Sequence, residues 1–268
     1  MDAKEPMIAT QPVHGTLIEQ AVALLEHRPL DQVSLRRLRN EAQAAMHADP
    51  AASHIVLGIL SCMEGNVAEM HQHHRIAINL DSQSYMAYEN YIVSLQRSGF
   101  YREAWQLAQE SLEKFPDVKS LLELAVRSAF YSGRVHQAAE MLEHRWHKIS
   151  PETDNVMATR IDDVAGVCNE LGLNDDMLSH AIEAAYETIR ELASNVSSTV
   201  RWRRFNTMEW DGKPFLAYDV GLDIPIEKTS NINEKFIEKT LQYFALDNGL
   251  VITYASAKIE NAEHYYGD

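Results

Sequence analysis

Cysteine is scarce in this chain of 268 residues, which holds only Cys62 and Cys168. Two cysteines are too few for a framework of disulfide bonds, and they are typical of a reducing compartment. The first residues, MDAKEPMIATQPVHG, lack the basic stretch and apolar run that mark a secretory signal. No apolar stretch approaches the length of a membrane span. We therefore expect a soluble, cytoplasmic protein with no membrane partner.

Basic residues are also in deficit. The chain has 24 Lys and Arg against 39 Asp and Glu, which gives a formal net charge of −15. Most of this excess lies before residue 199, because residues 199–268 hold 8 basic and 11 acidic side chains. An acidic surface repels nucleic-acid backbones and anionic membranes and favours a basic partner, although acidity also serves solubility. We expect no nucleic-acid partner.

Catalytic signatures are missing from the sequence. It contains no G-x-S-x-G, no glycine-rich phosphate-binding loop and no H-E-x-x-H. The adjacent pairs Asp162-Asp163 and Asp175-Asp176 point to different sides of a helix, so neither pair shares one substrate easily. We therefore expect the protein not to be an enzyme and to need no cofactor.

A repeated phrase is the most informative feature that is present. The hexamers GNVAEM (65–70), GFYREA (99–104) and GRVHQA (133–138) follow one another at a spacing of 34 residues. A fixed period between about 20 and 50 residues signals a stacked-repeat fold. The pattern predicts that each glycine lies in a turn between two helices, where a positive φ costs it nothing. The sixth residue of each phrase then marks a close approach of the second helix to the first.

This pattern resembles the tetratricopeptide repeat (TPR) family. Leu57-Gly58, the G-x-Y-x-E-A phrase at 99–104 and Pro116 at the end of a unit carry the resemblance. The best units are 51–84, 85–118 and 119–152. The stretch LGLNDDM (171–177) suggests a degenerate pair over 154–194, and amphipathic patterns suggest another over 16–50. The resemblance implies a mainly α fold for residues 1–198, a TPR-like α-solenoid in which helix pairs form a right-handed superhelix.

The period changes after residue 198, and residues 199–268 predict a small α+β domain. SNVSS (194–198) is typical of a linker, and the two runs around Asp211-Gly212 alternate as a β-hairpin does. An amphipathic helix over 230–249 and a last strand from Leu250 complete a β-β-α-β order. The apolar stripe expected on this helix consists of Ile232, Phe236, Ile237, Leu241 and Phe244. The sheet face or edge left open must be covered by the solenoid, by a second copy or by a partner strand. A homodimer through this domain is therefore one expectation.

The TPR resemblance also implies where a partner binds. In this family the first helix of each pair lines a concave groove that holds an extended peptide or a helix. The corresponding positions here are Ile55, Ile59, Met86, Glu89, Val93, Gln96, Glu123, Arg127 and Phe130. The alternative is that these side chains pack against a neighbouring helix of the same chain.

Two further clusters are weaker candidates. His71 and His74 are three residues apart and share a helix face, which makes them weak candidate metal ligands, whereas packed or solvated histidines are the default. RWRRF (201–205) mixes arginine with aromatic residues as nucleic-acid surfaces do, but alternation along a strand explains it without a ligand.

The sequence thus favours a protein–protein interaction module or adaptor. Its groove would bind a protein or peptide that is basic or carries apolar anchors. Two alternatives stay open at this point. One is an acidic inhibitor, immunity protein or chaperone-like protein that masks a basic partner. The other is an enzyme whose site lies at the junction between solenoid and tail.

Overall fold

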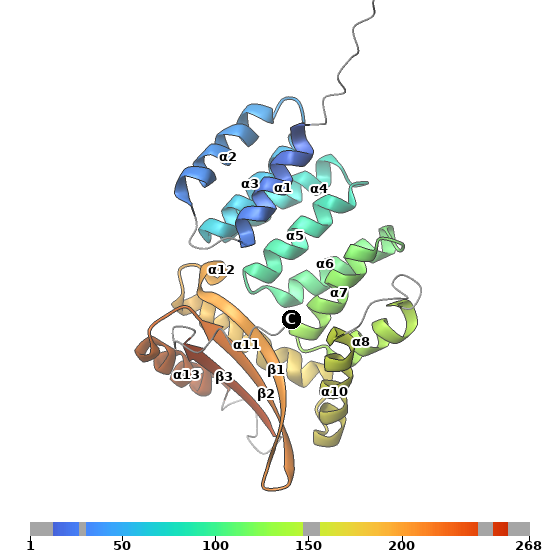
Figure 1. Ribbon diagram of the computed structural model, residues 1–268, viewed down its shortest axis with the longest axis vertical. Coiled ribbons are helices and arrows are strands. Elements are labelled where there is room, and N and C mark those ends of the chain that lie inside the picture. Colours follow the sequence, from blue (N-terminus) through green and yellow to red (C-terminus); the bar gives the residue numbers. More distant parts are fainter. Residues whose placement is uncertain (1–12, 27–30, 147–155, 241–248, 257–268) are drawn as a thin grey trace, which may run out of the picture. The chain divides into compact units, whose positions relative to one another are not determined.

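A computed structural model describes residues 13–26, 31–146, 156–240 and 249–256 of the protein (Figure 1). They form a mainly helical chain with a small three-stranded sheet near its C-terminal end, which confirms that part of the prediction. No helix within these ranges is both long and apolar enough to cross a bilayer. The helices of residues 13–146 are α1 (Val13–Glu26), α2 (Gln32–Ala45), α3 (Pro50–Glu64), α4 (Val67–Leu80), α5 (Tyr85–Arg97), α6 (Tyr101–Lys114), α7 (Lys119–Tyr131), α8 (Val135–Met141) and the π-helical turn η1 (Leu142–Trp146). The later elements are α10 (Val156–Leu171), α11 (Asp175–Leu192), α12 (Val196–Thr199), β1 (Val200–Trp210), β2 (Lys213–Leu222), α13 (Ile226–Thr240) and β3 (Leu250–Ser256).

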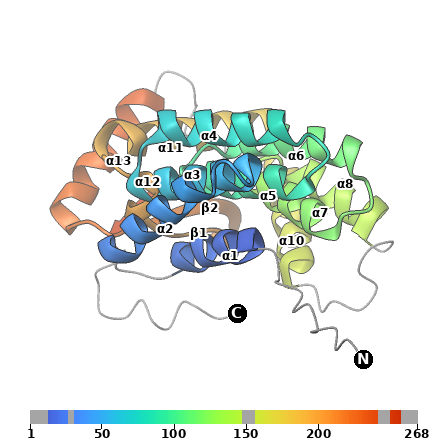
Figure 2. The ribbon, with the colours of Figure 1, turned by 90° about the horizontal axis from the view of Figure 1, so that it is seen from above.

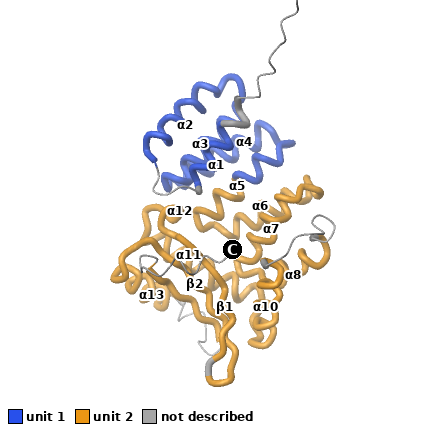
Figure 3. The backbone as a smooth tube through the Cα atoms, viewed as in Figure 1, with its two compact units in different colours: residues 1–90 blue, residues 91–268 orange. Residues whose placement is uncertain are grey.

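The chain divides into two compact units, residues 1–90 and 91–268 (Figure 3). Unit 1 contains α1 to α4 and the first residues of α5, and unit 2 contains the rest. The boundary that the sequence predicts at residue 198 lies inside unit 2. The strands are therefore part of the same compact unit as the helices α6 to α11.

The repeated phrase forms the same turn each time it occurs. Gly65, Gly99 and Gly133 have φ values of 78°, 77° and 81°, and Gly172 of the degenerate pair has 66°. At every one of them the glycine N–H donates to the carbonyl three residues back, and the next N–H donates to the carbonyl five residues back. This is the Schellman cap, which needs a left-handed residue that glycine supplies without strain. The 34-residue period therefore reflects one helix ending used three times, and the same ending occurs again 39 residues later at Gly172.

In unit 1, α3 is the central helix. Helices α1, α2 and α4 all pack against it, and its residues from Ile55 to Met63 are buried. A helix that is apolar nearly all round belongs in a core. Asp49 is the N-cap of α3, since its carboxylate accepts the N–H of Ala52, and Pro50 occupies the first helical position, where no N–H is needed.

In unit 2, neighbouring helices pack in sequence order from α6 to α10. Helix α7 contacts both α6 and α8, and α8 contacts α10. The sixth residues of the repeated phrases here, Ala104 and Ala138, are fully buried. Figures 1 and 2 show α13 beside α11, and the two helices are in contact.

The sheet has the strand order β1-β2-β3. Strands β1 and β2 are antiparallel, and β2 and β3 are parallel, with α13 between them in the chain. Asp211 and Gly212 connect β1 to β2 and have φ values of 52° and 71°. Two positive φ values in a two-residue turn are typical of the type I′ hairpin, which fits the twist of its strands. The hairpin that Asp-Gly predicts is therefore present.

One face of the sheet packs on helices of the same unit. The ring of Phe205 on β1 lies 4.9 Å from that of Phe130 on α7. The hydroxyl of Tyr254 on β3 donates to the carbonyl of Ala185 on α11, at 2.9 Å. Side chains facing this way are buried, among them Leu216, Tyr218, Val220 and Leu222. Helix α13 packs on the same face through Phe236 and Tyr254, so the expected cover of the other face or edge stays a prediction.

Two local expectations need correction. The stretch 194–198 is not an open linker, because Asn195 caps the short helix α12 and the side chain of Val196 is buried. Ile237, expected in the apolar stripe of α13, is 50% exposed. The buried stripe runs through Ile232 and Phe236, and Ile237 lies about 100° further round the helix. The predicted end of this helix, residues 241–248, lies outside the described residues.

Candidate functional site

The nine groove positions predicted from the sequence differ in exposure. Buried side chains belong to Ile55, Ile59, Gln96 and Phe130; partly buried ones to Glu89, Val93 and Glu123; and exposed ones to Met86 and Arg127. The four buried side chains are not open to a partner. The predicted groove as a whole stays a prediction, and only its partly buried and exposed positions are accessible.

Two of the buried positions in unit 2 have clear internal roles. Phe130 packs its ring against Phe205 of β1. Gln96 donates from Nε2 to Ser128 Oγ at 2.7 Å, a buried hydrogen bond between α5 and α7. Buried polar groups of this kind are costly to leave unpaired, so Gln96 is held by the fold itself. We do not carry either residue into the candidate site.

The two weak candidate metal ligands, His71 and His74, differ in how deeply they are buried. His71 is partly buried, but His74 is completely buried on α4 against Gly58 of α3, where a Cβ would stand 2.7 Å from the imidazole. Burial lowers the pKa of His74 to about 3, with smaller contributions from His73 and His71. In the described ranges no three His, Cys, Asp or Glu side chains are grouped to hold a metal ion. His74 is thus a packing residue.

The arginines of RWRRF each have a partner within the protein. Arg201 pairs with Asp223, and Arg204 Nε lies 3.6 Å from Asp219 Oδ2. The guanidinium of Arg203 lies between two tyrosine rings, 4.7 Å from that of Tyr101 and 4.5 Å from that of Tyr131. Such cation–π contacts are favourable where water is excluded. Arg203 therefore joins the sheet to the helices α6 and α7, whereas Arg201 and Arg204 pair with carboxylates on β2 and at its end.

One cluster has the residue types of a catalytic centre. His136 Nδ1 lies 2.8 Å from Asp175 Oδ1, and His136 Nε2 lies 3.1 Å from Asn169 Oδ1. Asp175 also accepts the backbone N–H groups of His136 and Gln137, so it caps the start of α8 from another helix. Cys168 stands next to Asn169 but is buried, and burial, followed by the charge of Asp175, raises its thiol pKa to about 12. A thiol of that pKa is not a nucleophile near neutral pH.

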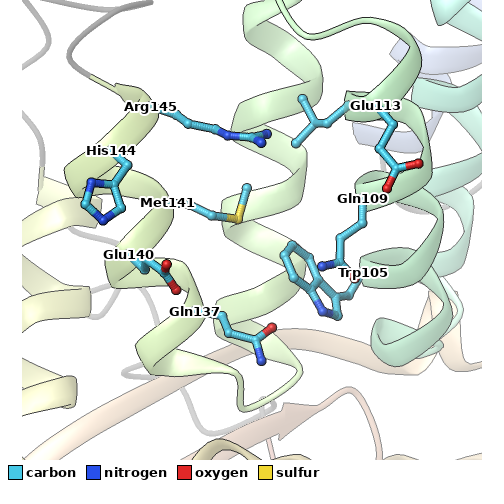
Figure 4. Close-up of a pocket in the computed structure, with 9 residues that line it drawn as sticks. Trp105, Gln109, Glu113, Gln137, Glu140, Met141, His144 and Arg145 are labelled. Carbon is cyan, nitrogen blue, oxygen red and sulfur yellow. The ribbon is translucent and has the colours of Figure 1, made fainter.

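A cleft between α6 and the α8–η1 segment is the strongest candidate site. Its volume is about 530 Å³, within the range of ligand pockets. One wall comes from α6 and the other from α8 and η1, and the side chains of Met141 and Arg145 extend towards the α6 wall (Figure 4). The lining residues are Trp105, Gln109, Leu112, Glu113, Gln137, Glu140, Met141, His144 and Arg145.

Helical spacing explains why these residues share the cleft. Trp105, Gln109 and Glu113 are four residues apart and form one row along α6. Across the cleft, residues 140 and 141 lie three and four residues after 137 on one face of α8, and the π-helical turn η1 continues the wall to residues 144 and 145. Trp105 and Leu112 are buried and form an apolar floor.

The charged side chains of the cleft form no ion pair with other residues in the described part of the chain. Glu113 and Glu140 are exposed on opposite walls, and Arg145 is exposed on η1. None of the three forms an ion pair among the described residues, whereas the neighbouring Lys114 is paired with Glu110. The cleft thus combines an apolar floor, two amide side chains and charges that are available to a ligand.

The TPR resemblance does not point to this cleft, because it places binding on the first helix of each pair. The cleft is built from the second helices, α6 and α8. The row of Trp105, Gln109 and Glu113 beside the buried Ala104 and Ala108 is a signal that the sequence does contain. A large aromatic residue next to the row of small residues indicates a second contact surface.

Comparison with known proteins adds no assignment: no protein-family model matches the chain, and no curated protein or solved structure matches it.

Proposed function

We propose that the protein is a protein-binding module of the tetratricopeptide-like repeat type. The support is a helix–turn–helix pair that occurs four times. Its first helix ends at Gly65, Gly99, Gly133 and Gly172, each time with the same cap. In such proteins, helix pairs stack and leave extended surfaces for a partner. The expected stacking into a right-handed solenoid is part of this proposal.

The binding surface we propose is the α6–α8 cleft, and the observation that carries it is the pair of available carboxylates above an apolar floor. Trp105, Leu112 and Met141 would desolvate against one apolar side chain of the ligand. Glu113 and Glu140 would each accept a hydrogen bond from a Lys or Arg of the ligand. Gln109 and Gln137 carry both donors and acceptors, which suit the peptide backbone.

The partner is therefore a protein segment that places a basic residue next to an apolar one. The formal charge of −15 also attracts such a segment from a distance and speeds its association. A buried aromatic floor surrounded by polar groups is the arrangement that concentrates binding energy at protein interfaces.

A selection experiment tests the proposal directly. Random twelve-residue peptides displayed on phage are selected on the full chain and on the variant Glu113→Gln/Glu140→Gln. The matched control is Glu103→Gln/Glu143→Gln, which removes the same charge from exposed positions on α6 and η1 outside the cleft. We expect peptides with Lys or Arg beside an apolar residue to be enriched on the natural chain and on the control, and not on the cleft variant. Absence of any enriched peptide, or equal enrichment on all three proteins, contradicts the proposed site.

A further inference from the structure

Two histidines of unit 1 face each other across a helix pair. His54 lies on α3 and His73 on α4, and their Nδ1 atoms are 2.9 Å apart. The ring centroids are 5.1 Å apart and the rings are tilted by 37°. Helices α3 and α4 pack tightly along their lengths and are joined by the Gly65 turn, so the two imidazoles are held in place by the backbone. Both side chains are only partly buried and can be reached from solvent.

In the protein itself the two facing nitrogens are hydrogen-bonded to each other. A neutral imidazole carries one N–H and one lone pair, so only one of two facing nitrogens can donate while the other accepts. A metal ion can replace this hydrogen bond once the proton of the donor ring moves to its other nitrogen, because a neutral imidazole carries its N–H on either nitrogen and is the form that binds metals.

The distance between these nitrogens matches a metal chelate. Metal–imidazole bonds are about 2.0–2.1 Å long, so two nitrogens at right angles around one ion are about 2.9 Å apart. Right-angled neighbours are typical of square-planar and octahedral coordination, the geometries of Cu²⁺ and Ni²⁺. A tetrahedral ion would need the nitrogens about 3.3 Å apart, a small rotation away.

We propose that His54 and His73 form a binding site for a divalent transition-metal ion of the Cu²⁺ or Ni²⁺ class. Water completes the coordination, because within the described ranges no third His, Cys, Asp or Glu joins the pair in ligand geometry. Glu69 lies one turn before His73 on α4 and adds a favourable negative charge nearby, while Arg39, which is paired with Glu64, adds an opposing positive one. His74, the adjacent residue, takes no part because it is buried against Gly58. The ion would pin α3 to α4.

Titration of NiCl₂ into the full chain without an affinity tag tests this site. Calorimetry is run on the natural protein, on His54→Gln, on His73→Gln and on the control His47→Gln, which changes an exposed histidine of the same unit. We expect loss of either facing histidine to weaken Ni²⁺ binding at least tenfold, and the control to leave it unchanged. Circular dichroism confirms that each variant is folded.

A second readout needs no substitution. Ni²⁺ is paramagnetic, so the NMR signals of backbone amides near the bound ion broaden on its addition. Broadening centred on residues 54 and 73 is expected at the lowest Ni²⁺ concentrations. Broadening centred elsewhere, no Ni²⁺ binding by the natural chain, or equal binding by all four proteins would overturn the proposal.

Discussion

The side of α6–α8 that meets the sheet and the side that lines the cleft use their side chains differently. Towards the sheet, Tyr101, Phe130 and Tyr131 are occupied by Arg203 and Phe205 of β1. In the cleft, an apolar floor lies beneath charges that have no partner among the described residues. One side of these helices thus holds the fold together, whereas the charged side chains of the other side form no ion pair within the described ranges.

Unit 1 shows the same contrast on a smaller scale. His73 and His74 are neighbours in sequence, and the 100° rotation per residue of a helix sends them to different surroundings. His74 is buried against Gly58, while His73 faces His54 where solvent can reach it. Of these two adjacent histidines, His74 is thus part of the core and His73 is accessible to solvent.

The largest effect is expected from removing the aromatic ring at the centre of the sheet–helix contact. Phe205→Ala deletes a buried ring that lies 4.9 Å from Phe130 and 4.7 Å from Tyr218. We expect a loss of about 3–5 kcal/mol in the free energy of unfolding, measured by urea denaturation. The control Met208→Ala, on the same strand but 51% exposed, should cost about 0.5 kcal/mol or less. Equal losses of unfolding free energy in the two variants would contradict the claim that the contact between sheet and helices holds the fold together.

The next largest loss of stability is expected from substitution of Gly133, compared with the same substitution of Gly172. Gly133 and Gly172 end their helices with similar φ values, but a Cβ at Gly133 would stand 2.6 Å from the backbone of Leu178, whereas one at Gly172 meets nothing within 4 Å. Gly172→Ala should cost about 1–2 kcal/mol from the left-handed backbone alone. Gly133→Ala adds a backbone clash, so we expect about 3 kcal/mol or more. Chemical denaturation of both variants measures this difference, and equal losses would mean that α11 does not pack on the turn.

Acid should destabilise the fold through His74. Its pKa is lowered from 6.5 to about 3 by burial, so the unfolded chain binds a proton below pH 6.5 that the folded chain refuses until about pH 3. Stability therefore falls as the pH drops through this window, by about 2 kcal/mol at pH 5 from this group. In His74→Leu, the decline in unfolding free energy between pH 8 and pH 5 should be smaller by that amount. An unchanged decline would show that His74 is not buried in its neutral form.

The smallest effect on stability is expected in the cleft. Glu113→Gln/Glu140→Gln changes two exposed carboxylates that have no ion pair among the described residues. The free energy of unfolding should change by about 0.5 kcal/mol or less, the range of ordinary surface substitutions. Thermal and urea denaturation check this. A larger loss would mean that these carboxylates serve the fold rather than a ligand.

The turns of the fold could be predicted from the sequence, because each depends on the conformation of a few consecutive residues. A left-handed helix cap requires glycine, so the phrases beginning at Gly65, Gly99 and Gly133 marked three helix–turn–helix pairs correctly. The Asp-Gly pair at 211–212 marked the hairpin for the same reason, because both residues take a positive φ. Each signal is confined to a few consecutive residues.

Contacts between distant segments could not be predicted in the same way. Alternation on β1 predicted that Arg203 and Phe205 share a face, but nothing local indicated that Tyr101 and Phe130 would cover it, from as far as 102 residues away in the chain. The TPR register also pointed to the first helices, and so it missed Trp105 and its cleft on the second helices. Which face of a helix stays open depends on what the rest of the chain packs against it.

Calorimetric titration of the most enriched selected peptide tests the central claim most directly. It is run on the natural chain, on Glu113→Gln/Glu140→Gln and on the control Glu103→Gln/Glu143→Gln at equal ionic strength. A cleft that holds a basic segment predicts a dissociation constant at least tenfold higher for the first variant, since charge-assisted hydrogen bonds contribute about 1.5–3 kcal/mol each. The control should differ from the natural chain by less than about twofold. Equal dissociation constants for all three proteins would contradict the proposal that the α6–α8 cleft is the binding site.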